Sequence, residues 1–169
     1  MSQKQCANLL KVVLIAAAIA VTFVYFYLAP MVAKTFLALV PAYAFAYWPW
    51  LGFVLISCIP VYIALVEVWA IFTRIGRDRS FCPENADSMR AVAILAGAEA
   101  LYLLLGFGGM WIWSMHNGFL RGLFQTHPGI FFIFVFLAFA AGMVCALCAA
   151  LTMLIRKANR LQEENDLTI

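Results

Sequence analysis

Four stretches of this sequence are almost free of charge and are long enough to cross a lipid bilayer. They cover residues 12–33, 50–73, 91–113 and 130–155. About 20 apolar residues, each rising roughly 1.5 Å in a helix, cross a hydrocarbon core of about 30 Å. Strands are excluded as spanning elements, because no stretch alternates polar and apolar residues and four strands cannot close a barrel in lipid. The sequence therefore predicts an all-α, polytopic membrane protein, a single four-transmembrane-helix bundle over residues 1–169.

The composition also indicates that the chain is surrounded by lipid. Apolar residues make up 66% of the chain and charged residues only 11%, with a mean hydropathy of +0.97. Soluble domains have about a quarter of their residues charged, and disordered or nucleic-acid-binding chains need low hydrophobicity or a basic face. We therefore expect the lipid bilayer as the main partner and no direct contact with nucleic acid.

The distribution of basic residues predicts an orientation. Lys and Arg concentrate in the cytoplasmic connections of membrane proteins. Nine of the eleven lie in the N-terminus, the loop 74–90 and the tail 156–169, which leaves Lys34 and Arg121 for the two remaining loops. Both termini are therefore expected on the cytoplasmic side of the membrane. The nine residues are Lys4, Lys11, Arg74, Arg77, Arg79, Arg90, Arg156, Lys157 and Arg160.

Two carboxylates interrupt the apolar spans. Glu67 precedes Arg74 by seven residues and Glu99 follows Arg90 by nine, so each is expected roughly 10 to 14 Å inside the cytoplasmic end. At similar depth on neighbouring helices, the two could share a proton. A carboxylate in the membrane costs about 2.5 to 3.5 kcal/mol and is a functional candidate by default. The alternative, which we favour, is that both stay protonated and form interhelical hydrogen bonds.

The fourth span carries a stripe of small residues at four-residue steps. Such a stripe lets a second helix approach closely, either within the bundle, which we favour, or in a homo-oligomer. Cys145 and Cys148 lie beside it as C-x-x-C, but a metal would need two further ligands, so we interpret both as small apolar residues. The stripe consists of Ala138, Gly142, Ala146 and Ala150.

The polar segments at the cytoplasmic side have local signatures of their own. Pro83 followed by Glu84 is a helix-start signal, so the third helix should begin below the membrane. The tail should continue the fourth span as a polar helix that turns from basic to acidic and ends on an apolar tip. Outside the apolar spans, most of the distinctive sequence lies in this loop and tail on the cytoplasmic side. We therefore expect the loop and the tail to form one docking surface. Its candidates are Arg74, Arg77, Arg79, Phe81, Glu84, Asn85, Arg90, Glu164, Asn165, Asp166, Leu167 and Ile169.

Two segments resemble a known family. The loop RDRSFCPENADSMRAVAI and the terminal ENDLTI are similar to those of the small bacterial membrane proteins grouped as domain of unknown function 2975. The resemblance implies a bacterial cytoplasmic membrane protein without established enzymatic activity. It also implies a gene that often lies beside one for a small helix-turn-helix transcription regulator.

Two functions follow as hypotheses. The leading one is a membrane anchor or sensor that binds a small cytoplasmic helix-turn-helix regulator through the docking surface. The alternative is a small oligomeric proton-coupled transporter or channel that uses Glu67 and Glu99. We expect no enzymatic activity, cofactor or metal, because the sequence has no ligand cluster, nucleophile elbow or phosphate loop.

Overall fold

The computed structural model describes residues 3–39, 45, 47–77, 79, 82–117 and 128–166. Within these ranges the chain is helical, without strands, which confirms the all-α class. The elements are α1 (Gln3–Phe23), η1 (Val24–Leu28), α2 (Ala29–Leu39), α3 (Tyr47–Ile75), α4 (Pro83–Asn117) and α6 (Pro128–Asp166).

The first span is one helix with a local change of pitch. α1, η1 and α2 follow each other without a break, and the wider π turn of η1 is closed by the Ala29 N–H donating to the Val24 carbonyl. A π turn inserts one extra residue and so rotates the side chains on either side of it relative to each other. It contains Tyr25, whose hydroxyl belongs to a polar cluster described below.

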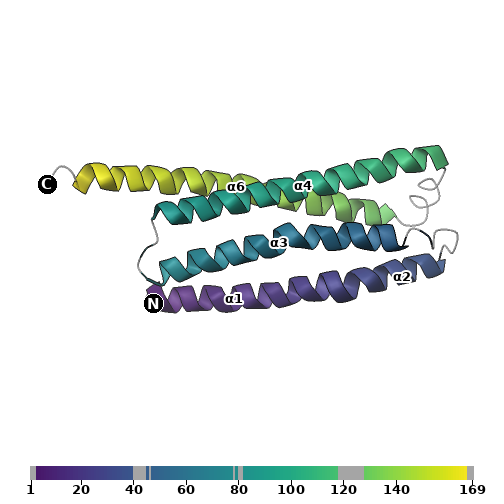
Figure 1. Cartoon of the computed structure of the whole chain (residues 1–169), viewed down its shortest axis with the longest axis horizontal. Coiled ribbons are helices and arrows are strands. Elements are labelled where there is room, and N and C mark those ends of the chain that lie inside the picture. Colours follow the sequence, from purple (N-terminus) through teal and green to yellow (C-terminus); the bar gives the residue numbers. More distant parts are fainter. Residues whose placement is uncertain are drawn as a thin grey trace.

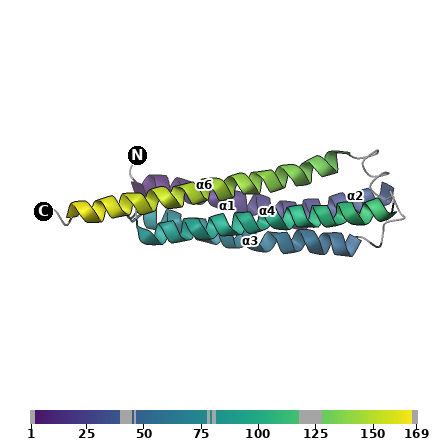
Figure 2. The ribbon, with the colours of Figure 1, turned by 90° about the horizontal axis from the view of Figure 1, so that it is seen from above.

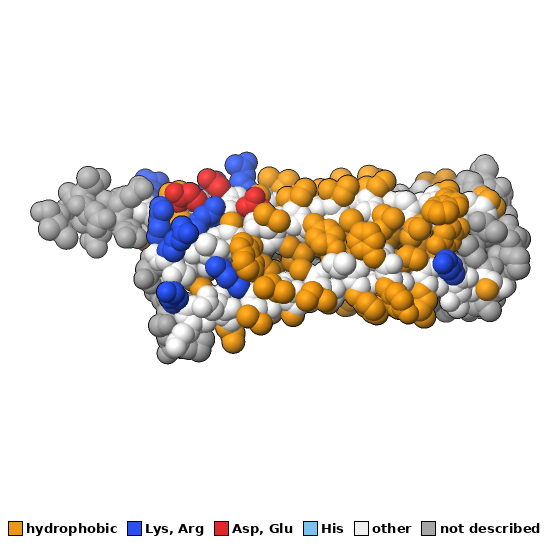
Figure 3. Space-filling view, turned by 60° about the horizontal axis from the view of Figure 1, so that its bottom comes forward, with side chains coloured by type: hydrophobic (Ala, Val, Ile, Leu, Met, Phe, Trp, Pro, Cys, Tyr) orange, Lys and Arg blue, Asp and Glu red, His pale blue; other side chains and the backbone are white. Residues whose placement is uncertain are grey.

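In the part of the chain that the structure describes, four helical segments are long and apolar enough to cross a membrane, as the sequence predicts. The helices extend beyond the apolar runs at both ends. α4 begins at Pro83, where its helix-start signal predicts, and α6 continues through the polar tail to Asp166. We call one end of the molecule the charged end (Figure 3). It holds the start of α1, the loop between α3 and α4, and the end of α6.

The helices pack in the order α1, α3, α4, α6 (Figures 1 and 2). The first helical span, α1 to α2, lies against α3, α3 lies against α4, and α4 lies against α6. Within the described residues, α6 contacts α4 and no other helix. The four-helix arrangement is therefore an open series, in which α3 and α4 are central and the first and last helices have most of their surface exposed to the surrounding lipid.

Candidate functional sites at the charged end and within the membrane

Asn85 organises the loop at the charged end. It is 1% exposed, and its amide nitrogen donates to the backbone carbonyl of Arg79 at 3.1 Å. Its amide oxygen accepts a bond from Arg74 Nη1 at 3.3 Å. One side chain of the first turn of α4 is thus bonded both to the end of α3, through Arg74, and to the backbone of Arg79.

Arg74 completes this arrangement from the α3 side. Besides Asn85, its Nη1 donates to the Ser88 hydroxyl at 2.9 Å and to the Glu84 carbonyl at 3.3 Å. Ser88 is 6% exposed. All three bonds come from Nη1, whose two hydrogens are shared among the three acceptors. We expected Arg74 and Asn85 at the docking surface. In the structure they instead bond to each other and connect α3 to α4.

Other candidates at the charged end face outward. Arg77, Arg79, Glu84 and Arg90 are exposed, and Arg79 Nη2 lies 3.4 Å from Glu84 Oε1. Hydrogen bonds from its own backbone N–H and from the Cys82 side chain lower the pKa of Glu84, and the nearby Arg79 guanidinium adds to this. Glu84 is therefore charged at neutral pH, and these four residues form the exposed part of the loop surface.

The tail does not lie along that loop surface. α6 borders the first turns of α4, where Arg156 Nη2 is 3.1 Å from Asp87 Oδ1. One turn further along α6, Asn159 and Arg160 still face the start of α4. Beyond this point α6 extends past the start of α4 (Figures 1 and 2). Glu164, Asn165 and Asp166 lie in this projecting part, whereas Phe81, Leu167 and Ile169 lie outside the described residues.

A chain of three hydrogen-bonding groups crosses the membrane-embedded part of the bundle. The Ser57 hydroxyl of α3 donates to Glu99 Oε1 of α4 at 2.6 Å, and Ser57 Oγ lies 2.9 Å from the Tyr25 hydroxyl. Because Ser57 has a single hydrogen and gives it to Glu99, Tyr25 must be the donor to Ser57. Glu99 is 8% exposed, and its second oxygen, Oε2, has no partner among the described residues.

The structure does not bring Glu67 and Glu99 together. Glu99 bonds to Ser57, which lies ten residues from Glu67, or about 15 Å along α3. The expectation of similar depth treated Arg74 and Arg90 as level. Counted from the Ser57–Glu99 bond along these antiparallel helices, Arg90 is level with about residue 66 of α3, well inside the level of Arg74, so Glu99 lies deeper than Glu67.

Tyr25 and Ser57 are functional candidates that sequence reasoning missed. A hydroxyl in an apolar span costs little to insert, so neither residue stands out in a hydropathy pattern. The available signal was their position: each lies within a span, and polar side chains in membrane helices tend to bond across helix interfaces.

The small-residue stripe of α6 follows α4 only in part. Ala138 is buried, Gly142 is half-buried, and Ala146 and Ala150 are exposed. A four-residue step advances 400° around a helix, so the stripe winds about 40° per step away from the α4 side. The residues that stay on α4 follow steps of three and four, and Cys145 and Cys148 are among them. Cys145 Sγ lies 3.2 Å from where a Cβ on Gly97 would be.

The comparisons with known proteins agree with this fold. A family model described as protein of unknown function, DUF2975, matches residues 31–169. The chain belongs to this family. This DUF2975 protein is 23% identical over 160 residues to the uncharacterized membrane protein YoaS of Bacillus subtilis strain 168, with 95% of each chain covered. No solved structure matches it. The family resemblance is confirmed, and the chain is a multi-pass helical membrane protein.

Proposed function

We propose that this protein is a non-enzymatic membrane anchor or sensor that binds a small cytoplasmic helix-turn-helix regulator at its charged end. The observation that carries the proposal is the end of α6, which extends beyond the other helices as a continuous helix to Asp166. A projecting helix offers a partner an accessible surface at a fixed position relative to the bilayer. Placing this end in the cytoplasm follows from its excess of Lys and Arg.

The charge of the projecting segment supports this class of partner. It contains Glu163, Glu164 and Asp166 within four residues. Regulators that bind DNA have basic surfaces for the phosphate backbone, and an acidic helix complements such a surface. Occupying the basic surface would keep the regulator at the membrane and away from DNA. The loop surface of Arg77, Arg79, Glu84 and Arg90, held by Asn85, offers a second contact.

Deleting residues 163–169 tests this function. Membranes from the native host that contain the full chain or the deletion variant are solubilised, and co-purifying soluble proteins are identified by mass spectrometry. We expect a small DNA-binding protein with the full chain and at least a tenfold loss with the deletion. A triple charge reversal, Glu163→Lys with Glu164→Lys and Asp166→Lys, should cause the same loss, whereas Lys34→Gln at the opposite end should not. Recovery of no DNA-binding protein with the full chain would contradict the proposal.

A second candidate function rests on the chain Tyr25–Ser57–Glu99. Two hydroxyls donate in sequence towards a buried carboxyl whose other oxygen has no partner among the described residues. Among the described residues, no basic side chain is bonded to Glu99. A negative charge on Glu99 would therefore lack a counter-ion. A carboxyl in such surroundings is suited to binding and releasing a proton, as in proton-coupled transporters. This version of the hypothesis depends on Glu99 and not on a pair with Glu67.

Vesicles that contain a pH-sensitive dye test the proton-coupled function. We expect proton entry through the reconstituted wild-type protein, its loss in Glu99→Gln and a clear reduction in Ser57→Ala. Glu67→Gln is the matched control, since it removes a carboxyl from α3 at a distance from the hydrogen-bonded chain. Proton entry equal to that of protein-free vesicles, or equal losses in both glutamine variants, would exclude this role for Glu99.

A further inference from the structure

A hollow lies between α4 and α6 at the charged end, apart from the residues assigned to regulator binding. Its volume is about 290 Å³. The α4 wall consists of Pro83, Ala86 and Asp87, and the α6 wall consists of Arg156, Asn159 and Arg160. Among the described side chains, two guanidinium groups, one amide and the Asp87 carboxylate therefore border this space.

The Arg156 guanidinium has donors to spare. Its Nη2 bonds to Asp87 Oδ1 at 3.1 Å, and within the described residues this is its one hydrogen bond to another side chain. The Arg156 side chain is 52% exposed. A guanidinium offers five N–H donors and binds phosphate oxygens through two parallel bonds, so Asp87 can orient Arg156 while other donors stay available.

The hollow lies at the depth of lipid phosphates. The middle of the apolar run 130–155 lies near residue 142, and Arg156 is about 20 Å from it along the helix. The hydrocarbon core extends about 15 Å from the bilayer centre, and the headgroups occupy the next 5 to 7 Å. The acidic residues of the tail begin at Glu163, about 10 Å further from the bilayer, and so lie outside this layer.

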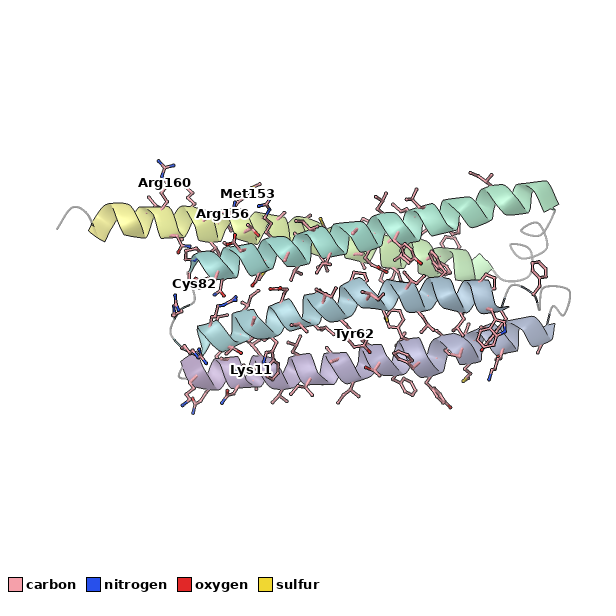
Figure 4. The ribbon with its side chains drawn as sticks, viewed as in Figure 1. Lys11, Tyr62, Cys82, Met153, Arg156 and Arg160 are labelled. Atoms are coloured by element: carbon pink, nitrogen blue, oxygen red, sulfur yellow. The ribbon has the colours of Figure 1, made fainter. Side chains whose placement is uncertain are left out.

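The surface next to the hollow suits an acyl chain. Met153, which lies one turn before Arg156 on the same side of α6, is 72% exposed. Figure 4 labels Met153, Arg156 and Arg160 along the same part of α6. Apolar side chains towards the bilayer centre and guanidinium groups at the headgroup level together match the two parts of a phospholipid.

We propose that this hollow binds the phosphodiester headgroup of an anionic phospholipid, with Arg156 and Arg160 as its ligands. Basic pockets between transmembrane helices are a recurrent mode of binding such headgroups. The lipid would fill the boundary between α4 and α6 and so stabilise the position from which the end of α6 projects. The site does not depend on the regulator, and it can exist whether or not a regulator binds.

Native mass spectrometry of the purified full chain in detergent tests the site. The protein is incubated with phosphatidylglycerol or with phosphatidylcholine of the same acyl chains, and retained lipid is measured. We expect preferential retention of phosphatidylglycerol. The double variant Arg156→Gln with Arg160→Gln should lower it on the order of 30-fold, because each basic side chain near an anionic surface contributes a factor of about five. Lys157→Gln, which changes a neighbouring exposed residue outside the hollow, should retain most of the wild-type binding.

Two further measurements distinguish binding of a lipid headgroup from binding of free phosphate and from a merely structural role of the arginines. Asp87→Asn removes a negative charge from the α4 wall of the hollow, and its repulsion of an anionic headgroup should outweigh its orienting bond to Arg156. We therefore expect this variant to raise phosphatidylglycerol retention, opposite in sign to the arginine variant and independent of whether that variant folds. Millimolar inorganic phosphate should displace no lipid, and displacement would assign the hollow to free phosphate. Equal retention of both lipids, no effect of the double arginine variant when folded, or a decrease in Asp87→Asn would overturn the proposal.

Discussion

The interface of α3 with α4 and that of α4 with α6 are built in different ways. Polar side chains connect α3 to α4 at three levels: Arg74 with Ser88 at the charged end, Ser57 with Glu99 inside the span, and the Tyr102 hydroxyl with the Phe53 carbonyl at 2.9 Å further out. The Tyr102 and Phe53 rings also stack, with their centroids 4.5 Å apart. Directional bonds thus fix the register of this pair.

Small side chains and close approach connect α4 to α6. Ala86 is fully buried, and Cys145 Sγ lies against Gly97. The bond of Arg156 to Asp87 lies at the charged end, at the edge of this interface. Since lipid tails are as apolar as the side chains, such an interface depends on how closely the surfaces fit. The α3 interface should therefore fail when a polar group is removed, and the α6 interface when volume is added.

The largest effect is expected from Gly97→Leu. The side chain would enter the space of Cys145, so we expect a loss of about 3 kcal/mol of unfolding free energy, at the upper end of typical overpacking costs. Unfolding by SDS in mixed micelles, followed by circular dichroism, measures it. Gly108→Leu is the control, because nothing lies within 4 Å of a Cβ at that position. Similar losses in both variants would mean that α6 does not approach α4 closely at Gly97.

Asn85→Ala should cost somewhat less, about 2 kcal/mol. The change removes a buried amide that satisfies the Arg79 carbonyl and one donor of Arg74, and buried polar groups left without partners cost about 1 to 3 kcal/mol each. We also expect faster proteolysis of the loop between α3 and α4. Arg77→Ala, in the same loop but exposed, serves as the comparison, and a protease-resistant Asn85→Ala would show that the loop is held by other contacts.

The helices and their approximate ends could be predicted from the sequence, because the cost of burying charge in lipid is large and independent of neighbours. The start of α4 at Pro83 followed from local helix-start chemistry. The neighbours of each side chain did not follow in this way. Pairing Glu67 with Glu99 required the register between α3 and α4, which depends on Arg74 reaching Ser88 and is not encoded in either span alone.

The same limit applies to the small-residue stripe and to Asn85. The four-residue spacing from Ala138 to Ala150 suggested one continuous face, but the pitch of the helix turns its later members towards lipid. Asn85 in a polar loop resembled a docking residue, and only the folded loop reveals that its amide is enclosed. Local rules therefore located the elements, whereas the chemistry of the site depends on contacts between them.

Ser57→Ala is expected to cost about 1 kcal/mol, since hydrogen bonds between membrane helices average about 0.6 and reach about 1.7 kcal/mol. The change leaves the Tyr25 hydroxyl and Glu99 without their shared partner. Ser57→Thr keeps a hydroxyl and should retain most of the stability in the same SDS titration. If Ser57→Ala were as stable as the wild type, the chain Tyr25–Ser57–Glu99 would be serving another role than joining the helices.

The smallest effect is expected from Asp87→Asn, below about 0.5 kcal/mol. The Asp87 and Arg156 side chains are 72% and 52% exposed, and exposed ion pairs contribute little because water and salt screen them. Raising the salt concentration in the SDS titration should therefore change wild type and variant alike. A loss above about 2 kcal/mol would mean that α6 is attached to α4 by this ion pair, and the contrast between a bonded and a close-packed interface would have to be abandoned. A small loss leaves close packing along Gly97 and Ala86 as the interaction that holds α6 in place.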